Sequence, residues 1–146
     1  MEAENVVALR PSEITTAVCS CVERGKNVAI VGPPGCGKSS LLEQVAVALK
    51  HDYLVSLPAL EDVTEPGGLP NFAADHSHAE KLLFGQAHKA VTAKRPTLWH
   101  WEDFGQAAPS VQAAYMQWAQ AREVDGKRLP DYVKISMATN RRTDKA

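Results

Sequence analysis

The segment that most constrains the fold of this chain is Gly32-Pro33-Pro34-Gly35-Cys36-Gly37-Lys38-Ser39. It fits the pattern G-x-x-x-x-G-K-[ST], in which a glycine-rich turn presents backbone N–H groups to phosphate oxygens. The apolar, β-branched run Asn27–Val31 before it predicts a buried strand. The apolar residues within Ser40–Leu49 after it recur at helical spacing. A strand, a tight turn and a helix in this order predict a phosphate-binding loop (P-loop) in an α/β fold.

The residue types in this loop suit a nucleoside triphosphate. Glycines let the backbone approach the phosphates closely, and the following helix directs its positive end toward them. We expect Lys38 to place a full charge near the β- and γ-phosphates and Ser39 to supply a hydroxyl ligand for Mg²⁺. The expected nucleotide-binding residues are Gly32, Pro33, Pro34, Gly35, Cys36, Gly37, Lys38, Ser39 and Ser40.

Length and charge narrow the class of protein. The 146 residues suffice for one domain with one core, and the net charge of −1 gives no electrostatic reason to expect nucleic acid or an anionic membrane as the main partner. The first residues are acidic, and no apolar run is long enough to span a bilayer. We therefore expect a cytoplasmic protein without a membrane partner.

The rest of the chain alternates between helical and strand patterns. We expect helices over Ser12–Arg24, Ala79–Ala93 and Pro109–Arg122, and strands over His51–Leu57, Thr97–Trp101 and Val133–Thr139. Prolines and the pair Gly67-Gly68 predict a long irregular loop from Pro58 to His78, and Asp125-Gly126 predicts a hairpin. The alternation predicts a parallel sheet with helices on both faces, a three-layer α/β/α fold.

Polar side chains follow two of the expected strands. Glu102 and Asp103 close the strand Thr97–Trp101, and Asn140 follows the strand Val133–Thr139. Parallel sheets place ligands at this edge, where adjacent carboxylates point in different directions and can hold different roles. Asn140 can hydrogen-bond a γ-phosphate or an attacking water. His100 lies in mid-strand between two tryptophans, which favours a buried, hydrogen-bonded histidine over a catalytic acid–base.

With these residues the chain resembles the AAA+ ATPases, and among them the MoxR-like, dynein-related branch. Gly32–Ser39 resembles Walker A, Trp99–Asp103 resembles Walker B, and Thr139-Asn140 resembles sensor 1. Three further segments resemble features of the MoxR-like branch: Gly105–Gln112, the hairpin around Asp125-Gly126, and Gly68–Pro70. The resemblance runs from about Arg10 to Arg142.

The resemblance implies ATP binding and Mg²⁺-dependent ATP hydrolysis that remodel a partner protein, in a homo-oligomeric ring. It implies that Glu102 is the magnesium carboxylate, that Asp103 polarises the attacking water, and that Asn140 senses the γ-phosphate. Lys38 completes the catalytic set. Proteins of this branch often work with a partner that carries a von Willebrand factor A domain.

Two departures from the family pattern leave alternatives open. The family's Walker B usually ends in Asp-Glu or Asp-Asp, whereas this chain has Glu102-Asp103, which leaves open an ATP-dependent binding switch with little turnover. A small P-loop kinase is a third reading. The chain ends six residues after Asn140, so residues 1–146 read as one incomplete domain without the family's fifth strand, arginine finger and helical lid. The family strand order 5-1-4-3-2 would then leave the P-loop strand at a sheet edge.

Overall fold

A parallel four-stranded sheet organises the computed structural model, which describes residues 8–143. Its strands are β1 (Val28–Val31), β2 (Asp52–Ser56), β5 (Thr97–Trp101) and β8 (Val133–Thr139), in the order β1-β8-β5-β2. Val31 pairs with Thr139, and Trp101 pairs with both Ser56 and Met137, so the carboxyl ends of the strands meet at one edge. This order matches the family order without its fifth strand, and it leaves β1 at an edge of the described sheet.

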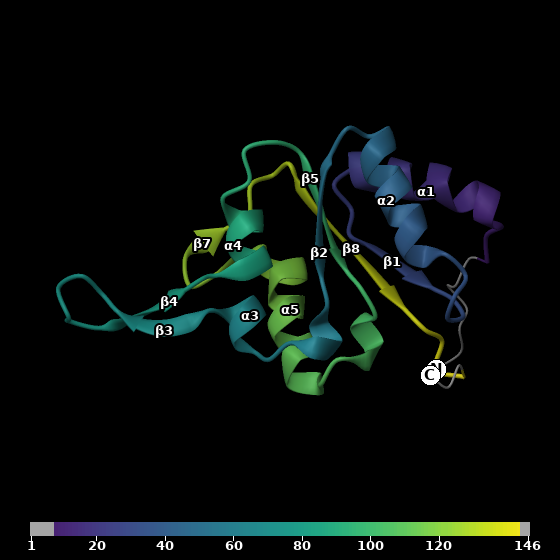
Figure 1. Ribbon diagram of the computed structural model, residues 1–146. Coiled ribbons are helices and arrows are strands. Elements are labelled where there is room, and N and C mark those ends of the chain that lie inside the picture. The colour runs from purple at the N-terminus through teal and green to yellow at the C-terminus, as the bar shows by residue number, and fades with distance from the viewer. Residues whose placement is uncertain (1–7, 144–146) are drawn as a thin grey trace.

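Helices cover both faces of the sheet and make three layers (Figure 1). On one face lie α1 (Pro11–Glu23) and α2 (Lys38–Ala48), and on the other lie α4 (Gly85–Val91) and α5 (Pro109–Ala121). Side chains along β5 alternate between these faces: Leu98 packs with the α1 and α2 side, and Trp99 and Trp101 pack with the α5 side. The three-layer α/β fold predicted from the sequence is confirmed.

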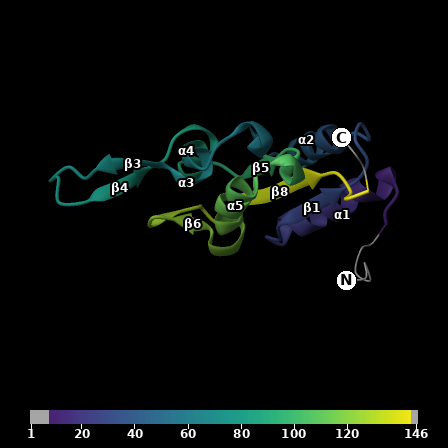
Figure 2. The same ribbon diagram turned by 90° about the horizontal axis from the view of Figure 1, so that it is seen from below.

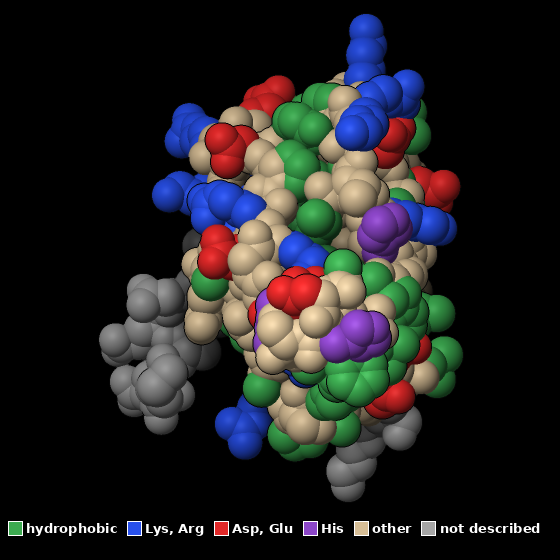
Figure 3. Space-filling model, turned by 90° about the vertical axis from the view of Figure 1, so that its left-hand side faces the viewer, with side chains coloured by type: hydrophobic (Ala, Val, Ile, Leu, Met, Phe, Trp, Pro, Cys, Tyr) green, Lys and Arg blue, Asp and Glu red, His purple; other side chains and the backbone are tan. Residues whose placement is uncertain are grey.

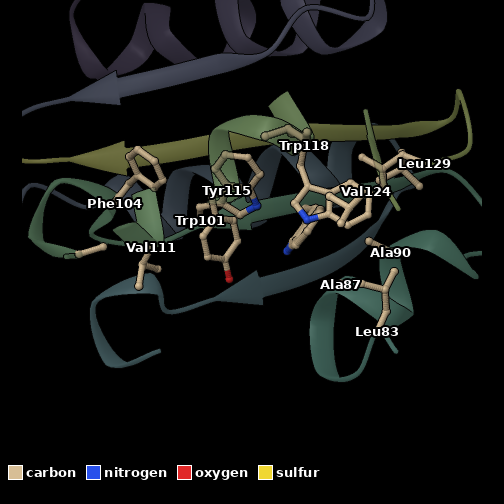
Figure 4. Packing of buried hydrophobic residues seen from close by; sticks show 14 residues of the cluster. Leu83, Ala87, Ala90, Trp101, Phe104, Val111, Tyr115, Trp118, Val124 and Leu129 are labelled. Carbon is tan, nitrogen blue, oxygen red and sulfur yellow. The ribbon is translucent and has the colours of Figure 1, made fainter. Parts of the chain in front are cut away.

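The core on the α5 side is built from aromatic rings (Figure 4). Trp101 and Tyr115 have ring centroids 4.8 Å apart, and Trp99 and Trp118 have centroids 5.9 Å apart. The polar atoms of three of these rings hydrogen-bond to the end of β2 or to the connection that follows it. Trp118 Nε1 donates to the Pro66 carbonyl at 2.7 Å, Trp99 Nε1 donates to Ser56 Oγ at 2.8 Å, and the Tyr115 hydroxyl donates to Glu61. The connection is therefore held against α5 rather than free in solvent.

The predicted irregular loop contains regular structure. It forms the 3₁₀ turn η1 (Pro58–Leu60), the short helix α3 (Thr64–Gly67) and the strand β3 (Leu69–Phe72). Strand β3 pairs antiparallel with β4 (Ala79–Leu82), and every residue of both strands is exposed. The two strands form an arm that projects away from the sheet in both ribbon views (Figures 1 and 2).

The predicted helix Ala79–Ala93 is wrong over its first third. Its apolar residues fit helical spacing, but Ala79–Leu82 pairs with β3, and the short helix α4 begins only at Gly85, which has φ +58°. Hydrogen bonding across the hairpin outweighs the local helical pattern because Ala79–Leu82 is exposed, and the residues of this segment that pack in the core all follow Leu82.

The second hairpin forms as the sequence predicts. It joins β6 (Glu123–Val124) to β7 (Lys127–Arg128), with positive φ at both Asp125 and Gly126, as the tight mirror-image turn requires. The Lys81 amide donates to the Asp125 carboxylate at 2.7 Å, which ties the base of the arm to this hairpin. Figure 3 looks at the molecule from the arm's end, where basic and acidic side chains are interspersed. Across residues 8–143, every helix falls short of the length and apolar character that a bilayer crossing demands.

Candidate functional site

The P-loop connects β1 to α2 at the edge where the strands end. Gly35 and Gly37 have φ values of +75° and +87°, in the left-handed region that side chains other than glycine rarely adopt. Gly37 directly precedes α2, whose first N–H groups have no intrahelical partners. The Gly32 amide donates to the Thr139 carbonyl at 3.2 Å, so the loop starts against the end of β8. This backbone geometry suits a bound anion.

Lys38 joins the loop to the end of β8. Only 8% of this residue is exposed, and its Nζ donates to the carbonyls of Gly32 at 3.0 Å and Pro33 at 2.8 Å. The same ammonium donates to Asn140 Oδ1 at 3.2 Å. Within residues 8–143 no carboxylate forms an ion pair with Lys38. Its positive charge is therefore held by neutral oxygens and is not cancelled by an acidic side chain.

Ser39 and Glu102 meet across the cleft. The Ser39 hydroxyl donates to Glu102 Oε2, and His100 Nε2 lies 3.2 Å from the same oxygen. A hydroxyl and a carboxylate in contact form an oxygen donor set of the kind that Mg²⁺ takes in sites that also hold phosphates. The residues present therefore fit the ion that the fold implies.

Asp103 turns the chain away from β5. Its backbone is left-handed, with φ +48°, and it leads into the 3₁₀ turn η2 (Phe104–Gln106). Aspartate tolerates this conformation better than most residues. The turn directs the chain into the loop that borders the cleft, so Asp103 and Glu102 both line it.

The cleft has a volume of about 520 Å³, within the range of small-molecule sites. It gathers most of the residues that the sequence analysis selected. It is lined by Pro34, Gly35, Gly37, Lys38, Ser39, Ser40, Glu102, Asp103, Gln106 and Asn140. The other three selected loop residues, Gly32, Pro33 and Cys36, line a smaller adjoining cavity of about 210 Å³ together with Leu9, Pro11, Ile14, Ile30 and Leu41.

Sequence reasoning missed this apolar cavity and the position of Gln106. It also missed a close contact between the loop after Asp103 and β8. The Gly105 amide donates to Thr139 Oγ1 at 3.1 Å, and a Cβ on Gly105 would lie 2.2 Å from that oxygen. Glycine at position 105 therefore lets this loop lie directly against the end of β8. No pattern in the sequence pairs these two positions, because the contact depends on where β8 falls in the sheet.

His100 is buried and hydrogen-bonded, as the sequence analysis predicts, but one of its partners belongs to the candidate site. Its side chain is fully buried, and its nitrogens contact Ser136 Oγ at 2.9 Å and Glu102 Oε2 at 3.2 Å. Burial lowers the pKa of His100, although the nearby Glu102 carboxylate opposes that shift. Residues two apart on a strand share a face, so the spacing of His100 and Glu102 carried a signal for this contact.

Comparisons with known proteins agree with the fold and the loop. The protein family described as "AAA domain" matches residues 28–133. A comparison with curated proteins gives no match. Among solved structures, a mutant of RuvB from Thermotoga maritima is 17% identical over 97% of this chain and 40% of its own, with a TM-score of 0.59.

Two other solved structures show the same likeness. A Cytophaga hutchinsonii protein proposed to be an ATPase is 14% identical, with coverage of 96% of this chain and 41% of that one and a TM-score of 0.58. NtrX from Brucella abortus is 11% identical, with coverage of 92% and 31% and a TM-score of 0.58. This chain therefore spans about two fifths or less of these proteins' lengths. Identities this low show a shared fold.

Because the family match covers more than half of the sequence, this chain belongs to the AAA domain family and carries a nucleotide-binding P-loop NTPase domain.

Proposed function

We propose that this domain binds ATP together with Mg²⁺ and hydrolyses it. One observation carries the proposal: a single cleft holds a cation, a hydroxyl, two carboxylates and an amide from three distant segments. These are Lys38, Ser39, Glu102, Asp103 and Asn140. Their placement around a glycine-rich loop matches the needs of phosphoryl transfer, in which positioning and charge stabilisation do most of the work.

The phosphates would bind along the P-loop and the first turn of α2. Lys38 Nζ, now held by two loop carbonyls and Asn140 Oδ1, would exchange some of these neutral partners for anionic phosphate oxygens. Hydrogen bonds to charged groups are about twice as strong as neutral ones, so this exchange favours binding. Asn140 would keep the ammonium in place and contact the terminal phosphate.

Ser39 and Glu102 would hold Mg²⁺, which neutralises charge on the phosphates when bound. The hydrogen bond between them would break as the hydroxyl turns to the metal. Asp103 would accept a hydrogen bond from the attacking water and orient it toward the terminal phosphate.

The nucleobase would lie in the smaller cavity beside the P-loop. Leu9, Pro11, Ile14 and Leu41 supply its apolar lining, and it shares Gly37 and Lys38 with the phosphate cleft. A planar base fits an apolar cavity that adjoins the loop holding the phosphates. We infer that the ligand is ATP, with its adenine placed there.

We further propose that hydrolysis drives remodelling of a partner protein by a homo-oligomeric ring, as in the MoxR-like branch. The partner would be a protein, such as one with a von Willebrand factor A domain. The support is the AAA family match, together with the Gly105 loop and the Asp125-Gly126 hairpin, both of which resemble features of that branch.

A second candidate, an ATP-dependent switch with little turnover, is favoured by the order Glu102-Asp103. An aspartate at the second position is one methylene shorter than the glutamate of the family's Asp-Glu form, and catalysis is sensitive to displacements of about 1 Å. The two candidates predict different responses to lengthening that side chain: turnover rises in the switch and gains little in an active hydrolase.

Phosphate release from this chain under single-turnover conditions tests both candidates. Hydrolysis should fall at least about tenfold in Asp103→Asn and disappear in Lys38→Ala, while Lys89→Ala on the distant helix α4 leaves it unchanged. A large rise in Asp103→Glu would favour the switch. Equal rates of phosphate release in Lys38→Ala and the unaltered protein would contradict the proposal that this domain is a hydrolase.

A further inference from the structure

Beneath the candidate metal site, a chain of hydrogen bonds runs from β8 through β5 to the P-loop helix. Ser136 Oγ lies 2.9 Å from His100 Nδ1, and His100 Nε2 lies 3.2 Å from Glu102 Oε2. That oxygen also accepts from the Ser39 hydroxyl. Ser136 and His100 are both fully buried, whereas 17% of the Glu102 side chain is exposed. The chain therefore leads from the protein interior to the cleft.

The partners on each side of the imidazole select one arrangement of its proton. An ionised carboxylate can only accept hydrogen bonds, so Nε2 must carry the proton that points at Glu102. With the proton on Nε2, the bare Nδ1 can accept a hydrogen bond from the Ser136 hydroxyl, which is able to donate. Tyr53 stacks on the ring at 6.0 Å with an interplanar angle of 20°, which restrains the plane of the imidazole. The ring is thus held in position and in one tautomer.

Glu102 needs such support more than a shorter residue would. Glutamate has one more rotatable bond than aspartate, so fixing its carboxylate costs more conformational freedom. In residues 8–143 Glu102 Oε2 has two hydrogen-bonding side chains, Ser39 and His100. If Ser39 turns to a metal ion, His100 remains to hold the carboxylate.

We propose that His100 is a positioning residue: it holds the Glu102 carboxylate in the orientation that binds Mg²⁺, and the Ser136 hydroxyl, bonded to the other ring nitrogen, holds the imidazole in place. This inference rests on the proposed function and deepens it, because it assigns the metal-holding role of Glu102 to a three-residue unit. Partners behind a metal ligand typically contribute about 10- to 100-fold in metal affinity.

Two substitutions separate this role from simple packing. In His100→Gln the side-chain amide nitrogen reaches the former Nε2 position and still donates to Glu102. In His100→Asn the shorter amide reaches only the Nδ1 position next to Ser136, and the donor to Glu102 is lost. Both replacements are neutral, polar and smaller than histidine, so they perturb the core in similar ways.

The readout is the Mg²⁺ concentration that half-saturates the tightening of a fluorescent ATP analogue, alongside the affinity without Mg²⁺. We expect His100→Asn to raise the half-saturating Mg²⁺ about tenfold and His100→Gln to stay within about threefold, with Mg²⁺-free affinity unchanged in both. Equal effects of the two variants, or none, would overturn the proposal. A wild-type protein whose nucleotide binding ignores Mg²⁺ would instead overturn the proposed function and this inference with it.

A second measurement needs neither a variant nor a ligand. Long-range ¹H–¹⁵N spectra of the unliganded protein report which imidazole nitrogen carries the proton. A protonated Nε2 and a bare Nδ1 in His100, with the Nδ1 signal shifted in Ser136→Ala, support the hydrogen-bond chain. A protonated Nδ1 would overturn it even if His100→Asn failed to fold.

Discussion

Replacing Gly105 by alanine should disrupt the contact that seats the loop after Asp103 on β8. A Cβ at this position would lie 2.2 Å from Thr139 Oγ1 and 3.5 Å from Thr139 Cβ, and real Cβ atoms essentially never approach within 3.0 Å. Forcing the Thr139 side chain off its rotamer costs about 0.5–1.5 kcal/mol. Losing its hydrogen bond from the Gly105 amide costs about 0.5–1.5 kcal/mol more. We therefore expect Gly105→Ala to lower the free energy of unfolding by about 1–3 kcal/mol, as for other overpacked sites.

The assay is urea denaturation of Gly105→Ala, Thr139→Ala and the double variant. Thr139→Ala removes the clashing oxygen and leaves the new Cβ in ordinary contact with a methyl group. The double variant should therefore be more stable than the sum of the single effects predicts, by at least about 0.5 kcal/mol. Strictly additive effects would refute the contact between this loop and β8.

Three further predictions concern the core and the loop. Burial, followed by the contact with Glu61, raises the pKa of Tyr115, so this residue's contribution to stability should hold below pH 10 and fall above it by about 1.4 kcal/mol per pH unit. Burial raises the pKa of Tyr53 as well, so Tyr115→Phe should make the fall shallower by that amount without abolishing it, in urea titrations at several pH values. Trp118→Phe leaves the Pro66 carbonyl without its donor and should lower the free energy of unfolding by about 1–3 kcal/mol, measured in the same way. Gly37→Ala, at φ +87° in open space, should cost about 1–2 kcal/mol from backbone strain, whereas Gly67→Ala, also in open space but without positive φ, should cost little.

Much of the fold follows from local patterns in the sequence. The strands Thr97–Trp101 and Val133–Thr139 have the predicted bounds, because both are rich in apolar, aromatic and β-branched residues and are largely buried in the sheet. The helices Pro11–Glu23 and Pro109–Ala121 begin at the prolines that suit a first helical turn.

The arm formed by β3 and β4 was not predicted, for a physical reason. Its strands are exposed on both faces, so neither carries the alternation that marks a half-buried strand. Its pairing comes from hydrogen bonds between segments that only the hairpin brings together.

The candidate site, like the fold, could be predicted from the sequence only in part. The P-loop could be selected from the sequence because its glycines, Lys38 and Ser39 have a fixed spacing, and the polar residues Glu102, Asp103 and Asn140 because each follows an expected strand. The sequence analysis did not predict three contacts: that of Lys38 with Asn140, that of Gly105 with Thr139 and that of His100 with Glu102. The first two depend on β8 lying between β1 and β5, an order that local sequence patterns do not encode.

The measurement that tests the central claim most directly is equilibrium binding of a fluorescent ATP analogue to this chain, with and without Mg²⁺, beside Lys38→Ala. The account predicts saturable binding that tightens with Mg²⁺ and is lost in Lys38→Ala, since that ammonium is the positive charge placed in the cleft beside the P-loop. Binding of equal strength in Lys38→Ala, or no binding by the unaltered chain, would contradict it.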